Sequence, residues 1–148
     1  MKLAIGSDHG GFRLKEEIKA LLTELQVDSH DFGTYTAESV DYPDIACQIA
    51  QAVAGGEYER GIIICGTGIG VNIAANKVKG IRAALCHDVF SARMAREHND
   101  ANILNLGERV IGAGLARMIV EMWLRTEFAG GRHTCRVEKI MDLEKAQK

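Results

Sequence analysis

The sequence lacks the features that mark several other classes of protein. Its four cysteines lie far apart and form neither a C-x-x-C pair nor a metal-ligand spacing, which argues against a disulfide framework and a metal site. Its 18 lysines and arginines do not outnumber its 20 aspartates and glutamates, so there is no basic excess for nucleic acid. Charged residues interrupt the apolar run around Trp123, so no segment is expected to cross a membrane. We therefore expect a soluble protein with free thiols in the cytoplasm.

What is present predicts one α/β domain. The 148 residues, 47% hydrophobic and 26% charged, are enough for a single core over residues 1–148. Short β-branched runs alternate with segments of helical period, and parallel strands need such helical crossovers. The expected fold is a doubly wound sandwich of the Rossmann or flavodoxin type, with a parallel sheet of about five strands and helices on both faces. Strands are expected at residues 2–6, 27–32, 61–65, 81–86 and 102–106, and helices at 11–25, 42–54, 69–78, 89–98, 112–128 and 134–148.

Residue types typical of helix ends predict where two of the helices begin. Asp41 is expected to cap the helix that begins with Tyr42-Pro43. Gly130-Gly131 breaks the chain before the last helix, which is charged and amphipathic and is expected to pack on a partner subunit.

The segment from Arg60 to Ala74, RGIIICGTGIGVNIA, is the most informative part of the chain. A buried β-branched strand ends at Cys65 and opens into a loop in which Gly66, Gly68 and Gly70 alternate with larger residues. A helix is expected to begin near Ile69, and its positive end would stabilise a thiolate and a bound anion. The plainer interpretations are that Cys65 is a small buried hydrophobic residue and that Thr67 caps the helix.

The glycine loop does not match the common nucleotide or phosphate motifs. A dinucleotide fingerprint needs glycine at position 71, where this chain has Val71, and the loop follows the third expected strand instead of the first. A Walker loop needs Gly-Lys-Ser/Thr, and a cysteine phosphatase loop needs an arginine where Val71 stands. The loop therefore predicts an anion site without naming the reaction.

Other candidate site residues follow the expected strands or lie near the tail. Each has a structural alternative: Asp8 could cap a helix with His9 incidental, while His98 and Asn99 could simply end a helix. Arg132 and Arg136 are four residues apart and could grip a phosphate together with Arg109, or could pair with Glu138 or Asp142. No histidine or cysteine spacing favours a metal.

Taken together, several motifs resemble one enzyme family along essentially the whole chain. They are Ser7-Asp8-His9-Gly10-Gly11, Asp41-Tyr42-Pro43, Cys65-Gly66-Thr67-Gly68-Ile69-Gly70, Ala74-Ala75-Asn76-Lys77, Arg96-Glu97-His98-Asn99-Asp100 and Gly131-Arg132-His133. In this order they are similar to the type B ribose-5-phosphate isomerases, and the related galactose-6-phosphate isomerases share much of the pattern. A second branch of that family carries a glutamate base where Val71 stands, so the chain resembles the cysteine branch.

The resemblance implies a metal-free and cofactor-free interconversion of D-ribose 5-phosphate and D-ribulose 5-phosphate through a cis-enediolate. It assigns the base to Cys65, ring opening to His98 with help from Asp8 and Thr67, and enediolate stabilisation to Thr67 and the backbone of the glycine loop. It further implies a homodimer with shared sites, while pairing of dimers into tetramers stays open. The substrate-binding residues that it implies are His9, Tyr42, Gly66, Gly68, Ile69, Gly70, Val71, Asn99, Arg109, Arg132 and Arg136.

Three alternatives remain open at this level. The sugar could be allose 6-phosphate or galactose 6-phosphate, because its length is not legible from these residues. The chain could be a flavodoxin-like nucleotide-binding module with a passive cysteine. It could also be one subunit of a heteromeric isomerase, although Asp8, Cys65, His98 and Arg132 all occur in this one chain.

Overall fold

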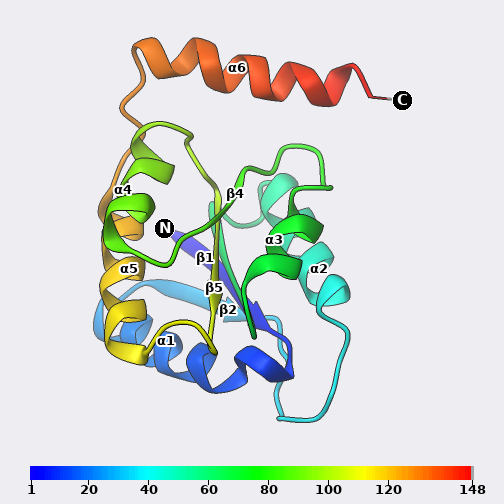
Figure 1. Ribbon diagram of the computed structural model, residues 1–148, viewed down its shortest axis with the longest axis vertical. Coiled ribbons are helices and arrows are strands. Elements are labelled where there is room, and N and C mark those ends of the chain that lie inside the picture. Colours follow the sequence, from blue (N-terminus) through cyan, green and yellow to red (C-terminus); the bar gives the residue numbers. More distant parts are fainter. Residues whose placement is uncertain (148) are drawn as a thin grey trace.

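The computed structural model describes residues 1–147, whose strands form one parallel sheet in the order β2-β1-β3-β5-β4 (Figure 1). Neighbouring strands run parallel in every pair. This arrangement confirms the predicted doubly wound α/β sandwich. The strands are β1 (Lys2–Ser7), β2 (Asp28–Asp31), β3 (Arg60–Cys65), β4 (Ala83–Leu85) and β5 (Ile103–Gly107).

Helices cover both faces of the sheet. One apolar core joins it to α1 (Phe12–Glu24), α4 (Val89–Glu97) and α5 (Ala113–Arg125). The other core joins it to α2 (Tyr42–Ala54) and α3 (Ile69–Ala75). The central strand β3 serves both cores, because Ile62 and Ile64 face the first and Ile63 faces the second. That double burial is why β3 is a continuous apolar run.

Several element boundaries differ from the prediction. Helix α3 ends at Ala75 instead of Val78, because the Asn76 side chain turns away to bond the backbone N–H and C=O of Ala83. Strand β4 is an edge strand that spans only residues 83–85, and β2 spans 28–31. A short 3-10 turn, η1 (His9–Gly11), precedes α1, and α5 ends at Arg125.

Asp41 is the N-cap residue of α2 as predicted, but the expected side-chain hydrogen bond was wrong. Its side chain makes no capping hydrogen bond. Pro43 in the first turn needs no N–H partner, and its fixed φ favours a helix start without help from Asp41.

The last helix, α6 (Arg132–Lys145), lies apart from the sandwich, across the end of the molecule at the top of Figure 1. It begins two residues earlier than predicted, directly after Gly130 and Gly131, both of which have positive φ. It leaves Ile140 and Leu143 exposed. Within the described chain, no helix combines the length and the apolar character that spanning a membrane requires.

The sheet order determines where a ligand can bind. From β1 the chain moves outward to β2, then returns to the other side of β1 to form β3. The connections after β1 and β3 therefore leave in opposite directions, and a crevice opens between the carboxyl ends of these two strands. Ser7 ends β1 and Cys65 ends β3 at this switch point.

Candidate active site

A cleft of about 400 Å³ lies at the switch point between β1 and β3. Its wall combines loops that follow β1, β3 and β5 with the first residues of α2 and α3, as expected at the carboxyl edge of a doubly wound sheet. Its lining residues are Asp8, Tyr42, Cys65, Gly66, Thr67, Ile69, Gly70, Ile73 and Arg109. Eight of these nine were predicted as site residues, the exception being Ile73.

Cys65 is held at the floor of this cleft by the backbone around it. Its side chain is buried, and its Sγ accepts a hydrogen bond from the Gly68 N–H at 3.1 Å. Its carbonyl accepts the Glu108 N–H at 3.0 Å, and Cys65 pairs with Gly107 at the end of the ladder between β3 and β5. The sulfur therefore has a fixed position and a donor that would stabilise a thiolate.

Two of the loop glycines are required by close contacts. Gly68 has φ +76°, and a Cβ there would lie 2.5 Å from Leu85 Cδ1 and 2.8 Å from the Leu106 carbonyl carbon. A Cβ on Gly70 would lie 2.6 Å from the Tyr42 ring, which packs directly over this glycine. The first glycine lets the chain turn beneath the sulfur, and the second lets Tyr42 close one side of the cleft.

The backbone amides after Cys65 divide into engaged and open donors. The Gly68 N–H donates to Cys65 Sγ, and the Ile69 N–H donates to the Thr67 hydroxyl oxygen at 3.2 Å. Within residues 1–147, the N–H groups of Gly70 and Val71 make no hydrogen bond. The Val71 side chain is fully buried, so only its backbone can reach a ligand. An anion in the cleft would thus find two open amide donors.

Asp8 and His9 have both structural and site features. Asp8 Oδ1 accepts the Gly11 N–H at 3.2 Å, which is the predicted capping alternative, and the same side chain lines the cleft. His9 Nδ1 accepts the Val40 N–H at 3.2 Å, which ties the loop before α2 to the cleft margin. His9 itself does not line the cleft.

Arg109 supplies the positive charge of the cleft. Its backbone N–H bonds the Gly66 carbonyl at 3.0 Å, and its guanidinium lies against Gly66, where a Cβ would come within 3.2 Å of Nη1. Arg109 is exposed and forms no ion pair with the rest of the described chain. An unpaired guanidinium beside open amides is suited to a phosphate or another anion.

The remaining predicted residues form a second group around the start of α6. His98 follows α4, and its ring stacks on His133 with centroids 4.2 Å apart. Burial, together with repulsion from His98, Arg132 and Arg136, lowers the pKa of His133. Neither Arg132 nor Arg136 pairs with an acidic side chain in residues 1–147, and Asp142 pairs with Lys145 instead. Arg132 and Arg136 therefore form a cationic surface without acidic partners in the described part of the chain.

The two groups lie at opposite ends of the sheet. His98 and Asn99 precede the first residue of β5, Ile103, whereas Cys65 pairs with Gly107 at the far end of the same strand. Four steps of about 3.3 Å separate the ends of β5, so a single chain keeps the groups at least about 13 Å apart. Figure 1 agrees, with α6 at the top and the loops that follow β3 and β5 toward the bottom. In one copy of the chain, the predicted site residues thus form two separate groups.

Comparison with known proteins places this chain among the sugar isomerases. The model of the family described as Ribose/Galactose Isomerase matches residues 3–140. The chain belongs to the ribose/galactose isomerase family. This family includes ribose-5-phosphate isomerase B of Escherichia coli, to which the chain is 54% identical, with 97% of this chain and 96% of the relative covered.

Two further relatives place the chain within the family. The solved structure of ribose-5-phosphate isomerase B from Clostridium thermocellum has a TM-score of 0.97 and 60% identity, with 99% of each chain covered. A D-erythrulose-4-phosphate isomerase of Pectobacterium atrosepticum is 45% identical, with 100% of this chain and 98% of the relative covered. Membership of this family leaves the flavodoxin-like binding module without support.

Two residues near the site were not predicted to take part. Ile73 lines the cleft one helical turn after Ile69, and both side chains are exposed on α3. Apolar residues at i and i+4 on an otherwise exposed helix face were the signal that could have identified Ile73. His133 is adjacent to Arg132 in a motif that the sequence analysis quoted, but its stacking on His98 depends on tertiary packing.

Proposed function

We propose that this chain interconverts D-ribose 5-phosphate and D-ribulose 5-phosphate by proton transfer at Cys65. The observation that carries the proposal is the Cys65 sulfur at the floor of the cleft, 3.1 Å from the Gly68 amide and beside the unpaired Arg109. Family membership supports the reaction type, and the relatives at 54% and 60% identity are named ribose-5-phosphate isomerase B.

The chemistry needs one base that reaches two neighbouring carbons. Cys65, as the thiolate, would take a proton from C2 of the aldose and return it to C1, which passes through an enediolate. The negative charge develops on the substrate oxygens, where the Thr67 hydroxyl and the open N–H groups of Gly70 and Val71 can donate. These donors bind the enediolate more strongly than the neutral carbonyl, so they lower the barrier.

The ring-opening half of the reaction is assigned to a second copy of the chain. Ribose 5-phosphate is mostly a closed furanose, and His98 is the proposed acid and base that opens it, with Asp8 and Thr67 assisting across the cleft. His98 and Asn99 lie at the end of the sheet opposite Cys65, so a site that contains both needs two chains. We therefore propose a homodimer with shared sites.

In this dimer the phosphate would be held by arginines from both chains. Arg109 belongs to the Cys65 half-site, and Arg132 and Arg136 belong to the His98 half-site of the partner copy. Because Arg132 and Arg136 are one turn apart on α6, both guanidinium groups can reach one phosphate. Tyr42, His9 and Asn99 would complete the sugar pocket.

A cysteine variant tests the base assignment. We expect Cys65→Ala to abolish turnover while phosphosugar binding and the far-UV spectrum stay unchanged, because the sulfur transfers the proton and does not hold the phosphate. Binding is measured by calorimetry and turnover by conversion of ribose 5-phosphate in the presence of a chelator. Near-normal turnover by this variant would refute the assignment.

The identity of the sugar needs a separate comparison. Ribose 5-phosphate is the proposed substrate, while allose 6-phosphate, galactose 6-phosphate and D-erythrulose 4-phosphate are the related candidates. We expect the highest kcat/KM for ribose 5-phosphate when all four are assayed at equal concentration. A higher value for another sugar would keep the reaction type and reassign the substrate. We further propose a cytoplasmic location, which is consistent with the relatives being sugar-phosphate isomerases.

A further inference from the structure

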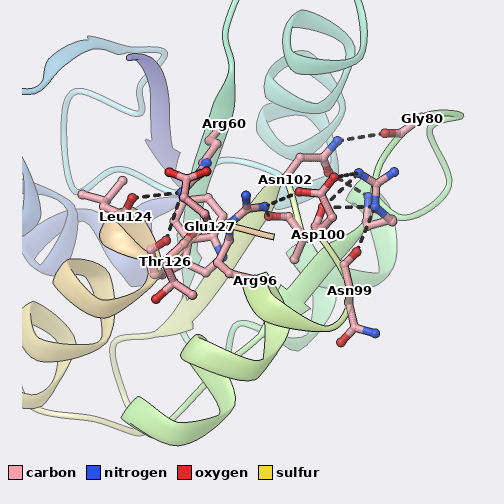
Figure 2. A network of polar contacts seen from close by, with 12 residues as sticks. Arg60, Gly80, Arg96, Asn99, Asp100, Asn102, Leu124, Thr126 and Glu127 are labelled. Carbon is pink, nitrogen blue, oxygen red and sulfur yellow. Dashed lines mark hydrogen bonds and ion pairs between the residues drawn. The ribbon is translucent and has the colours of Figure 1, made fainter. Parts of the chain in front are cut away.

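The turn between α4 and β5 is held by a polar network that is separate from the cleft (Figure 2). This turn, residues 98–102, carries His98 and Asn99 of the proposed ring-opening half-site. Asp100, at its centre, has φ +46°, a left-handed conformation that costs a non-glycine residue energy. Such a conformation persists only where the surroundings impose it.

Arg96 is the buried member of the network. Only 4% of its surface is exposed, and its Nη1 donates to Asp100 Oδ1 at 2.9 Å and to the Ala101 carbonyl at 2.6 Å. Its Nε donates to the carbonyl of Thr126, in the connection that leads to α6, at 3.2 Å. One guanidinium therefore ties the turn that carries His98 to the segment that precedes Arg132 and Arg136.

Arg82 holds the same turn from the opposite side. Its Nε donates to the carbonyls of Asn99 and Asp100 at 3.1 Å each, and its Nη2 donates to the Asp100 carbonyl at 2.9 Å. Its Nη2 also lies 3.4 Å from Asp100 Oδ2. The Asp100 carboxylate thus sits between two guanidinium groups, and each of them also binds backbone carbonyls of the turn.

We propose that Asp100, clamped by Arg82 and Arg96, is a positioning residue that fixes His98 and Asn99 for ring opening. The inference rests on the proposed function of His98 and adds residues that touch neither the cleft nor the substrate. A proton-transfer group must lie within hydrogen-bond reach of the ring oxygen, so a small shift of its backbone lowers the rate of ring opening strongly. The two charged contacts to Asp100 remove that freedom.

The test separates ring opening from proton abstraction. Ribulose 5-phosphate cannot close a furanose ring because its fifth oxygen carries the phosphate. Deuterium uptake from D₂O into C1 of unreacted ribulose 5-phosphate therefore reports proton transfer at Cys65 without ring opening. Conversion of ribose 5-phosphate requires both steps.

We expect Asp100→Asn to slow conversion of ribose 5-phosphate by roughly tenfold to hundredfold. Deuterium uptake into ribulose 5-phosphate should stay near that of the unaltered chain. Asparagine keeps the size of the side chain and tolerates positive φ, so the turn conformation stays accessible while the charged contacts that hold it in place are lost. Should this variant fail to fold, Arg82→Lys serves instead, because it keeps the charge and loses the forked contacts.

The matched control is Arg60→Lys. Arg60 is also a buried arginine at this end of the sheet, but it donates to the carbonyls of Trp123 and Leu124 and pairs with Glu127, and within residues 1–147 it forms no hydrogen bond or ion pair with the turn. Because lysine keeps the charge of Arg60, its electrostatic interaction with Asp100 is retained in this variant. We expect it to lower stability and to leave the ratio of conversion to deuterium uptake unchanged. The same drop in this ratio as in Asp100→Asn would overturn the proposal.

Two further variants complete the design. His98→Asn should show the same selective loss of ring opening, and if it slows both measurements equally, the proposed role of His98 fails. If His98→Asn shows the split and Asp100→Asn does not, only the positioning proposal fails. Asp100→Gly adopts the turn conformation freely but has no carboxylate, so full conversion by this variant would also overturn the proposal.

Discussion

At the residue scale, several side chains serve the fold and the cleft together. Asp8 caps η1 and also lines the cleft. Thr67 lines the cleft as well, and its hydroxyl accepts the N–H of Ile69 at the start of α3. The structural interpretation of these residues is therefore compatible with the functional one, which stays a prediction. His87 belongs to the same region, because its Nε2 accepts the N–H of Gly107 at 3.2 Å, beside the end of β3 that carries Cys65.

This contact of His87 predicts a pH-dependent stability. Burial lowers the pKa of His87 below its ordinary value of 6.5, because a protonated ring would lose solvation and could not accept from Gly107. The unfolded chain then binds this proton more readily, so stability is complete above the unfolded pKa and is lost as pH falls toward the folded pKa. We expect the free energy of unfolding to decrease between about pH 7.5 and about pH 5.5.

The variant His87→Gln isolates this contribution. Glutamine keeps an acceptor for the Gly107 N–H but does not titrate, so its loss of stability over the same pH window should be smaller. Urea unfolding of both proteins at the two pH values measures the difference. His133, whose pKa is also lowered, is present in both proteins and cancels in the comparison. Equal losses would show that His87 does not titrate on unfolding.

At the element scale, the buried Lys15 of α1 joins this helix to the edge of the sheet. Its Nζ lies 2.9 Å from both carboxylate oxygens of Asp31 in β2 and donates to the Thr34 carbonyl beyond it. Lys19, which is one turn along and partly exposed, also pairs with Asp31 at 2.8 Å. Burial opposes ionisation of Asp31, but hydrogen bonds from Lys19, Lys15 and the Gly33 amide lower its pKa overall.

We expect Lys15→Met to lower the free energy of unfolding by about 3 kcal/mol, because it leaves a half-buried carboxylate with only one cation and removes the donor to Thr34. Lys19→Met is the matched control on the same helix and should cost about 1 kcal/mol or less, because the Lys19 side chain is partly exposed and Lys15 still pairs with Asp31 in this variant. Chemical denaturation measures both values. Similar losses in the free energy of unfolding in the two variants would contradict the expectation that the buried Lys15 contributes more than the partly exposed Lys19.

At the scale of the whole molecule, the predicted site residues are divided between the two ends of the sheet. The cleft group surrounds Cys65, and the cationic group surrounds His98 and the start of α6. The α6 helix also exposes Ile140 and Leu143. That this helix packs on a partner subunit stays a prediction, and the proposed shared site would give such packing a functional reason.

A mixing experiment tests the shared site directly. Cys65→Ala and His98→Asn are each expected to be impaired alone, but a mixed dimer has one site with both native residues. If subunits exchange at random in an equal mixture, half of the dimers are mixed and activity should recover to about a quarter of the native level. Activity on ribose 5-phosphate is followed after co-refolding. A mixture no more active than the better single variant would contradict the shared site.

Much of the fold could be predicted because its signals are local. The isoleucine run of β3 and the glycines after Cys65 identify a buried strand and a tight loop from a few neighbouring residues. The end of α3 was missed because Asn76 bonds Ala83, a partner that local periodicity cannot reveal. Aspartate is a common N-cap residue, which is why the sequence predicts a capping bond from Asp41, but its side chain forms none in the structure.

The alternation of strands and helices, the cysteine before the glycine loop and the family resemblance can all be read from the amino-acid sequence, because they depend on residue type and spacing along the chain. Which of the predicted site residues lie together depends on the folded arrangement of the sheet. The register of β3 and β5 places Cys65 at one end of the sheet and the turn after α4 at the other. Spacing along a chain does not specify the sheet end at which a residue finally lies, and that position determines whether one chain can complete the site.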